Sequence, residues 1–495
     1  MNDIKLVESN EQPMKNHLLS SRERIRSIYW AIELELRGWD IRSAFVGGTV
    51  SAIVYVIFLK YISDRREQLG LQVSDLYRYD ALLNLYPNVV NQQELCEYLG
   101  DVERQLGLSQ RLLQNFVLDV KSPNLDAKFL DALHIANELD FRSNDIAQIE
   151  IEELVRIVEK VIESEGKVSG LVYTPLAIST LMSEICQIKD GMSVYDPCAG
   201  CGLSLIQAIR GKDVSVFAQE QNMHIAAILE MLLIMTGVRK GAVRCDDSIW
   251  HPLTQIFDQK FDCIISEPPY MRPETSYRTS IDKNLIGQVL YYPDQKIEDT
   301  WIFIRHIVAS LKENGKAAVL VPMSMLTREG SAAVSRKKLI VDGYIDSVIE
   351  LPANAFSNRN MKTSILILRK EKPIHNIYML DLSRGLWDEK CKTGKDGIAE
   401  ITEMVLNRKI VAGASDIVET EEIVQNAYQL AVSRYVPQEI DVEQFLADSV
   451  KLYRTADKLE AKFERLCREF KEAMEDYNGY CNERKSKQRR KPYGE

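Results

Sequence analysis

The chain has 495 residues, more than a single ordinary hydrophobic core holds, so two or three domains are expected. Hydrophobic residues make up 45% of it and charged residues 27%, which is typical of a soluble globular protein. The net charge of -10 is unusual for a protein that binds nucleic acid, but it does not exclude such binding. A local basic face or a basic partner subunit is enough to contact the phosphates.

The sequence shows no sign of export or of a membrane anchor. The polar N-terminus lacks the apolar stretch and cleavage site of a secretory signal. The uncharged run from Ala44 to Leu59 is shorter than the about 20 residues of a membrane span and favours a buried helix. Nine cysteines, an odd number, favour reduced thiols, so the expected location is the cytoplasm. Cys198 and Cys201 have the spacing of half a zinc site, but no second pair or histidine partner follows, so no metal is expected.

Residues 1–165 are predicted to form an N-terminal helical domain. Apolar residues recur at helical spacing in four stretches, which are Glu23 to Leu36, Val50 to Leu69, Gln92 to Leu106 and Ile149 to Glu163. No catalytic spacing occurs among them. His134 has apolar neighbours and is expected to be a packed histidine and not a ligand.

Residues 166–370 are predicted to form an α/β core, because short apolar runs alternate there with helical patterns. The runs are Ser193 to Tyr195, Val214 to Ala218, Phe261 to Ile265, Ala317 to Val321, Tyr344 to Leu351 and Ser364 to Leu368. This alternation is the signature of a doubly wound sheet. Residues 371–440 have a mixed pattern and are expected to extend this core.

Residues 441–495 are predicted to form a helical tail. Its apolar residues step by 4, 3, 4, 3 and 4, the spacing of a coiled-coil seam. They are Leu452, Ala456, Leu459, Phe463, Leu466 and Phe470. Packing on the chain's own domain and docking of a partner protein both remain open. The basic residues from Arg484 to Lys491 are more often a solvated end than a nucleic-acid contact.

A loop of small residues follows the first strand of the core, in the order Asp196-Pro-Cys-Ala-Gly200-Cys-Gly202. Gly200 and Gly202 let the backbone come close to a ligand, and free N–H groups at the start of the next helix suit an anionic one. A dinucleotide loop would have a third glycine where this chain has Leu205, which disfavours NAD.

Glu220 follows the second apolar run, about 20 residues after the loop, where an acid takes the hydroxyl groups of a ribose. The expected ligand is therefore a nucleoside without a diphosphate, and S-adenosylmethionine fits this description.

A second motif, Glu267-Pro268-Pro269-Tyr270, follows the third run. The prolines fix the backbone and expose carbonyl groups, and the aromatic ring offers a stacking surface for a base extruded from a duplex. Alone, this stretch would be read as a turn with a core tyrosine. It shares the ligand-binding edge of the predicted sheet with the glycine loop, which favours a functional role.

Together these motifs resemble the N6-adenine DNA methyltransferases, specifically the modification subunits of type I restriction-modification systems, over nearly the whole chain. Val172 to Pro175 is similar to the segment that closes on the methionine end of the cofactor, and Asp196 to Gly202 to the cofactor loop. Asp247, with Asp246 as the alternative, resembles the acid near the cofactor adenine. Further similar segments are Leu36 to Gly38, Val56 to Asp64, Gly315 to Pro322, Val348 to Pro352 with Phe356, and Asn426 to Leu430 with Arg434 to Val436.

The resemblance implies a Rossmann-like S-adenosylmethionine-dependent methyltransferase sheet with an N-terminal helical domain and a coiled-coil-like tail. The implied cofactor-binding residues are Leu171, Val172, Tyr173, Thr174, Pro175, Asp196, Ala199, Gly200, Cys201, Gly202, Leu203, Glu220 and Asp247. The implied catalytic residues are Glu267, Pro268, Pro269 and Tyr270, with direct methyl transfer and no metal.

Glu267 departs from the family pattern, in which an asparagine usually precedes the two prolines. The asparagine carbonyl and the carbonyl of the first proline accept hydrogen bonds from the adenine amino group. A glutamate is one methylene longer, and it either accepts these bonds and takes the released proton, or overreaches the site. Two hypotheses stay open: an active adenine methyltransferase with a variant motif, and a cofactor-binding subunit with impaired transfer.

The resemblance also implies partners. These are double-stranded DNA with a flipped adenine, a specificity subunit that reads the target, a restriction subunit and a second copy of the chain, which together defend a cell against phage. The heptad helix from Leu452 onward is the candidate docking element. An RNA or protein methyltransferase is the alternative, because Pro-Pro-Tyr also occurs in enzymes that methylate glutamine or RNA adenine.

Overall fold

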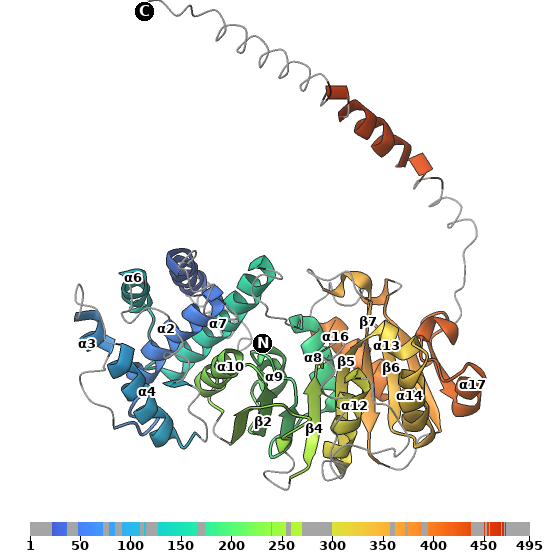
Figure 1. Ribbon diagram of the computed structural model, residues 1–495, viewed down its shortest axis with the longest axis horizontal. Coiled ribbons are helices and arrows are strands. Elements are labelled where there is room, and N and C mark those ends of the chain that lie inside the picture. Colours follow the sequence, from blue (N-terminus) through green and yellow to red (C-terminus); the bar gives the residue numbers. More distant parts are fainter. Residues whose placement is uncertain are drawn as a thin grey trace, which may run out of the picture. The chain divides into compact units, whose positions relative to one another are not determined.

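The protein is described by a computed structural model (Figure 1). The described residues are 22–36, 48–72, 79–84, 92–108, 113–114, 127–165, 174–238, 240–253, 259–269, 299–356, 362–371, 375–383, 385–387, 395–436, 450, 453–454, 456–466, 468–469 and 471. The chain divides into two units, Met1–Val436 and Pro437–Glu495.

The four helices predicted near the N-terminus are confirmed. Residues 22–36 are helical, and the other elements of this segment are α2 (Gly48–Asp64), α3 (Tyr79–Asn84), α4 (Gln92–Leu106), α6 (Ala127–Ala136) and α7 (Asn144–Glu165). Every residue of α2 from Val50 to Ile62 is buried, as its nearly uninterrupted apolar sequence requires. Among the helices that the structure describes, none is long and apolar enough to cross a lipid bilayer. The expectation that His134 is packed is wrong, because its side chain lies exposed on α6.

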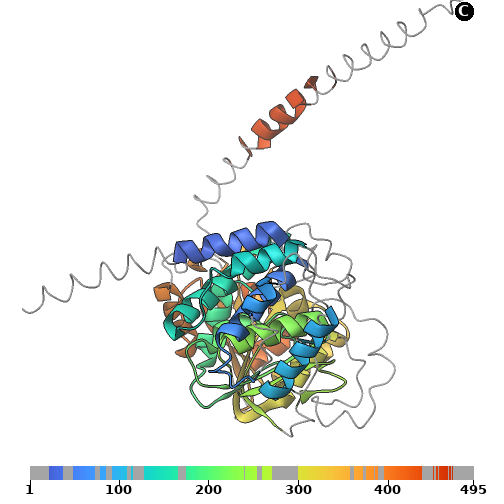
Figure 2. The same cartoon turned by 90° about the vertical axis from the view of Figure 1, so that its left-hand side faces the viewer.

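The N-terminal helices pack on the α/β part of the same unit. Helix α2 contacts α10 (Met223–Met235) as well as α6 and α7. Figure 2 shows these helices, coloured blue to cyan, in front of the sheet. Two arginines of the first helix, Arg22 and Arg26, pair with the buried carboxylate of Glu153 on α7 at 2.8 and 2.6 Å. Buried apolar residues of the helical segment and of the sheet belong to one continuous hydrophobic core.

The sheet has nine strands in the order β3-β2-β1-β4-β5-β7-β6-β8-β9 (Figure 1). The strands are β1 (Ser193–Asp196), β2 (Ser215–Glu220), β3 (Gly241–Cys245), β4 (Phe261–Ser266), β5 (Leu311–Pro322), β6 (Ile345–Glu350), β7 (Thr363–Arg369), β8 (Asn376–Asp381) and β9 (Ser415–Glu419). Strands β3, β2, β1, β4 and β5 are parallel to one another, β7 runs antiparallel to β5 and β6, β8 is parallel to β6, and β9 runs antiparallel to β8. The predicted α/β architecture is confirmed.

Helices cover both faces of the sheet, because successive strand side chains point to opposite sides. Val194 and Val216 belong to the core that α8, α9, α10 and α16 complete, whereas Tyr195 and Phe217 belong to the core on the side of α12 and α14. The helices are α8 (Leu176–Cys186), α9 (Leu203–Ile209), α12 (Asp299–Ser310), α13 (Met323–Thr327), α14 (Ser331–Val341), α16 (Lys395–Leu406) and α17 (Thr420–Gln425), with 3-10 turns at Ala353–Ala355 and Val432–Arg434.

In the second unit, residues 456–466 are helical, as the heptad spacing predicts. Three seam residues lie exposed: Leu459 by 62%, Phe463 by 68% and Leu466 by 50% of the side chain's reference area. Leu452 and Phe470 lie outside the described residues. The described part of the seam has no cover within this unit.

Candidate functional site

The first four strands end at one edge of the sheet, and each end brings an acid there. Strands β1, β2, β3 and β4 are mutually parallel in neighbouring pairs, so their carboxyl ends meet. Asp196 is the last residue of β1 and Glu220 the last of β2, while Glu267 directly follows β4. Asp246 and Asp247 follow β3. This is the edge at which open α/β sheets bind ligands.

The glycine loop after β1 is fastened to β2. The N–H of Ala199 donates to the Gln219 carbonyl at 2.9 Å, and the N–H of Gly200 donates to Glu220 Oε2 at 3.1 Å. Gly202, at φ 83°, has no room for a side chain, because a Cβ would lie 2.2 Å from Cδ1 of Leu229 on α10. Glycine is required there by both backbone conformation and packing.

One expectation for this loop is wrong. The N–H of Gly202 is not free for an anionic ligand, because it donates to the Ala199 carbonyl at 2.9 Å. The amides of Cys198, Ala199 and Gly200 also donate within the protein, so four of the loop's amides are used there. Helix α9 also has only 7 residues, which limits its dipole. The loop therefore offers little to a diphosphate, in agreement with the disfavoured NAD reading.

Asp196 forms the buried floor of the site. Its Oδ1 atom accepts hydrogen bonds from the Cys198 N–H at 2.9 Å and from the Ser266 hydroxyl at 2.8 Å. The pKa of Asp196 is raised to about 7: burial raises it most, the two hydrogen bonds lower it, and the nearby carboxylates of Glu220 and Glu267 raise it. Three carboxyl groups converge here, an arrangement that suits a cationic ligand.

Glu220 is held by backbone groups on both sides. Oε1 accepts from the Asn222 N–H at 2.8 Å, and Oε2 accepts from Gly200. Burial raises the pKa of Glu220, and the backbone hydrogen bonds oppose the shift. A third backbone N–H, that of Gln221, also favours the ionised carboxylate, and since a carboxylate offers about four acceptor sites, capacity remains for a ligand hydroxyl group.

Asp246 and Asp247 organise the turn after β3. Asp247 Oδ1 accepts from the N–H groups of Ile249 and Trp250 at 2.8 and 3.0 Å. Asp246 lies 2.9 Å from His251 Nδ1 and 3.3 Å from an Arg244 guanidinium nitrogen. Both acids follow β3 at the same edge of the sheet as Glu220, and the preference for Asp247 as the acid near the cofactor adenine stays a prediction.

Gln219 is a structural part of the site that the sequence analysis did not single out. Its Oε1 accepts from the Tyr195 hydroxyl at 2.7 Å and from the Leu253 N–H at 2.9 Å, and its Nε2 donates to the His251 carbonyl at 3.0 Å. The fully buried amide thus ties the Asp247 turn to β1. A glutamine within a buried strand was the available signal, because buried polar groups need partners.

Thr174 and Glu267 come together from distant parts of the chain. The Thr174 hydroxyl donates to Glu267 Oε2 at 2.6 Å. Thr174 is 5% exposed and precedes α8. Pro268 is buried and Pro269 exposed. The remaining predicted residues Leu171, Val172, Tyr173 and Tyr270 lie outside the described residues.

The two cysteines of the glycine loop are free thiols. Burial raises the pKa of Cys201 to about 12, so its thiol stays protonated and is a poor metal ligand. Within the described part of the chain, no group of three or more His, Cys, Asp or Glu could hold a metal ion.

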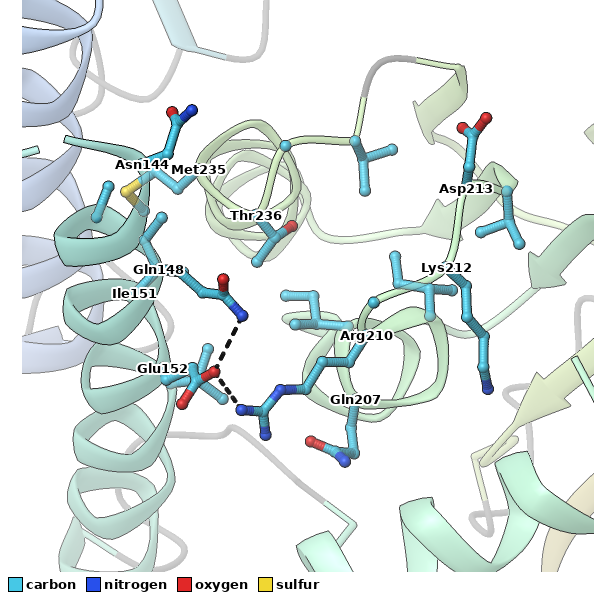
Figure 3. A pocket seen from close by; sticks show the side chains of 18 of the residues that line it. Asn144, Gln148, Ile151, Glu152, Gln207, Arg210, Lys212, Asp213, Met235 and Thr236 are labelled. Atoms are coloured by element: carbon cyan, nitrogen blue, oxygen red, sulfur yellow. Dashed lines mark hydrogen bonds and ion pairs between the residues drawn. The ribbon is translucent and has the colours of Figure 1, made fainter. Parts of the chain in front are cut away.

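A cavity of about 780 Å³ lies apart from this edge, between α7 and the C-terminal ends of α9 and α10 (Figure 3). Arg210, just after α9, forms an ion pair there with Glu152 on α7, which also accepts from Gln148 Nε2 at 3.5 Å. The lining of the cavity includes Asp213, which precedes β2, so the cavity lies near the amino end of that strand. The cavity lies between the helical segment and the α/β part of the chain, and its lining includes none of the candidate site residues after the strands.

The chain is similar in sequence to known methylase subunits. The methylase subunit of the type I restriction enzyme MpnII from Mycoplasma pneumoniae is 25% identical over 538 residues, covering 94% of this chain and 98% of that protein. The MjaVII methylase subunit from Methanocaldococcus jannaschii is 26% identical over 329 residues, covering 62% of this chain and 56% of that protein. The chain thus spans nearly all of the first relative and just over half of the second.

The fold is also found among solved structures. The methyltransferase subunit of a type I restriction-modification system from Streptococcus thermophilus superposes with a TM-score of 0.68 at 22% identity, covering 84% of this chain and all of that one. The sequence model of the N-6 DNA methylase family matches residues 154–444, which include β1 to β9 and all the acids of the site. The chain belongs to the N-6 DNA methylase family.

Proposed function

We propose that the chain is the modification subunit of a type I restriction-modification system, which transfers a methyl group from S-adenosylmethionine to N6 of adenine in DNA. The observation that carries the proposal is the convergence of Asp196, Glu220 and Glu267 at the carboxyl edge of β1, β2 and β4. In this proposal a separate specificity subunit reads the target sequence. The acidic balance of the chain is compatible with DNA binding, because the partner supplies most phosphate contacts.

The residues at the edge fit S-adenosylmethionine. Glu220 has acceptor sites left for the ribose hydroxyls, and Asp247 lies at the end of the neighbouring strand for the nucleoside half. The loop amides of Gly200 and Gly202 are engaged within the protein, as suits a cofactor without a diphosphate. The three carboxyl groups suit its positive charge. When bound, S-adenosylmethionine supplies a methyl group on a positively charged sulfur.

The side chains after β4 act on the adenine. Glu267 and the Pro268 carbonyl accept hydrogen bonds from the amino group, which draws the nitrogen lone pair out of conjugation with the ring. Glu267 then takes the proton that this nitrogen loses as it gains the methyl group. Tyr270 stacks on the flipped base. The protein contributes positioning and electrostatics, without a covalent enzyme intermediate or a metal.

Partner binding is assigned to the second unit. Its exposed seam residues Leu459, Phe463 and Leu466 have the spacing of a coiled-coil face. We assign this face to the specificity subunit, with a second copy of the chain and a restriction subunit completing the complex. The similarity to methylase subunits of type I enzymes supports this assignment.

Cofactor affinity is expected to rise with pH. Asp196, with a pKa of about 7, is largely protonated below that value in the free protein, and a cationic ligand favours its ionised form. The affinity for S-adenosylmethionine should therefore increase roughly 3- to 10-fold between pH 6 and pH 8, with proton release. Calorimetry in buffers of different ionisation enthalpy measures both effects.

Two controls accompany this measurement. S-adenosylhomocysteine, whose sulfur is neutral, should show a weaker pH dependence, and the Asp196→Asn variant should lose it. Equal affinity for S-adenosylmethionine at both pH values would rule out the coupling.

The proposed activity is tested with the chain copurified with its specificity subunit. Incubation with labelled S-adenosylmethionine and double-stranded DNA should yield N6-methyladenine, detected after digestion to nucleosides. In parallel, Glu220→Ala should weaken cofactor binding about 10- to 100-fold in calorimetry, because a charged hydrogen-bond acceptor is lost. Glu220→Gln, which keeps one acceptor oxygen, should lose less.

The matched control is Glu403→Ala, which removes an exposed carboxylate on α16. It should leave the affinity unchanged. If Glu220→Ala binds as tightly as the control, Glu220 does not contact the cofactor. If the complex forms no N6-methyladenine, the proposed reaction is wrong.

A further inference from the structure

The hydrogen bond between Thr174 and Glu267 joins two motifs that are 93 residues apart. Its length, 2.6 Å from Oγ1 to Oε2, is typical of a hydroxyl that donates to a carboxylate. A threonine hydroxyl has one proton to give, and here a side chain of the protein receives it. Thr174 was expected to contact the cofactor, so the observed contact points to a different task.

Thr174 is itself held firmly. Its carbonyl lies 3.3 Å from the hydroxyl of Ser179 on α8, and this hydroxyl lies 3.2 Å from that of Ser204 on α9. Helices α8 and α9 pack against each other, and α9 begins directly after Gly202. The backbone of Thr174 is therefore tied to α8 and α9, next to the glycine loop, and its hydroxyl contacts Glu267 from there.

The length of the glutamate side chain makes this restraint useful. Glu267 has one more methylene than the usual asparagine and therefore more rotamers to restrict. The hydrogen bond to Oε2 restricts the orientation of the carboxylate plane. It thereby also restricts the direction of Oε1. When one oxygen of the carboxylate is held in this way, the other points in a defined direction. Methyl transfer needs this, because its rate depends on how precisely the reacting groups are aligned.

We propose that Thr174 is a positioning residue for methyl transfer: its hydroxyl holds Oε2 of Glu267 so that Oε1 accepts the hydrogen bond from the amino group of the target adenine. This inference rests on the proposed function of the same site. It explains how a longer, charged residue takes the place of asparagine, because the hydrogen bond from Thr174 restrains the longer side chain.

The test is a double-mutant cycle on the complex with the specificity subunit. Thr174→Val, which keeps the shape and removes the hydroxyl, should lower kcat about 10-fold or more, because Glu267 loses its orientation. The dissociation constant of S-adenosylmethionine should change less than about threefold. Thr174→Ser, which restores the hydroxyl, should recover most of the rate. In a Glu267→Asn background, Thr174→Val should change kcat less than about twofold.

The matched control is Thr180→Val, the same exchange at a threonine of α8 whose hydroxyl donates to the Leu176 carbonyl at 2.7 Å. It should leave kcat within about twofold. The proposal is overturned if Thr174→Val keeps the full rate, if it loses the same factor in both Glu267 backgrounds, or if it weakens cofactor binding as much as the rate.

A further measurement separates this proposal from the proposed function. If the wild-type complex transfers no methyl group, the proposed function fails, and crystal structures of the wild type and of Thr174→Val then decide the positioning role. A displaced Glu267 carboxylate in the variant supports it, and an unmoved one refutes it.

Discussion

Glu267→Ala should lower kcat for adenine methylation by about 10²-fold or more while changing the dissociation constant of S-adenosylmethionine less than about threefold. The side chain follows β4 at the carboxyl edge, where it meets the Thr174 hydroxyl. In the proposed reaction it both orients the amino group and takes its proton. Alanine removes the two functions together, leaving the Pro268 carbonyl as the remaining acceptor. Single-turnover kinetics with a saturating cofactor concentration measures the effect on the chemical step.

Two further substitutions separate the functions of the carboxylate. Glu267→Gln keeps the length and an acceptor oxygen but is not a base, so a rate between those of the wild type and Glu267→Ala assigns part of the effect to proton transfer. Glu267→Asn introduces the residue usual in the family. If it creates activity in a chain that otherwise has none, the active-enzyme hypothesis is wrong and the impaired-transfer hypothesis gains. An unchanged rate in Glu267→Ala would remove the carboxylate from the reaction.

The strands that position the site could be predicted because they are continuous apolar runs. Strands β1, β2 and β4 each lie between two other strands of the sheet and are largely buried, so periodicity and flanking residues locate them. Strand β3 was missed, because Gly241–Cys245 is an edge strand with only Val243 fully buried and carries an arginine. Strands β8 and β9 were missed as well, and they add Asn376–Asp381 and Ser415–Glu419 to the same sheet as the core.

The acids of the site could be predicted from strand ends, but their contacts could not. Parallel strands deliver Asp196 and Glu220 to one edge whatever the details of packing. The contact from Thr174 to Glu267 depends instead on how α8 packs on α9, which no local pattern encodes. The same holds for the glycine loop, where the N–H of Gly202 could only be seen to be engaged once the turn itself was known. Tertiary packing therefore decided which polar groups were left for a ligand.

Removing the chain from Lys451 onward should abolish copurification with the specificity subunit and leave cofactor binding intact. The cofactor residues belong to the unit Met1–Val436, which is compact by itself, whereas the heptad seam belongs to Pro437–Glu495. Exposed apolar residues at heptad spacing are costly in water unless a partner helix covers them. Coexpression with an affinity-tagged specificity subunit and calorimetry with S-adenosylmethionine give the two readouts. Retained assembly would refute the docking role.

Point substitutions decide whether the seam itself is responsible. Leu459→Glu combined with Phe463→Glu places charge on the stripe that would face a partner, and it should weaken assembly at least about 30-fold, as loss of central apolar anchors does. Glu460→Ala combined with Glu464→Ala changes the adjacent residues, which are exposed and charged, and should weaken assembly less than about threefold. A helix that bound its partner through charge would reverse this order. If the stripe packs by apolar contact, the Leu459 and Phe463 substitutions must have the larger effect, because most of the binding energy of such an interface comes from the few side chains that become fully desolvated.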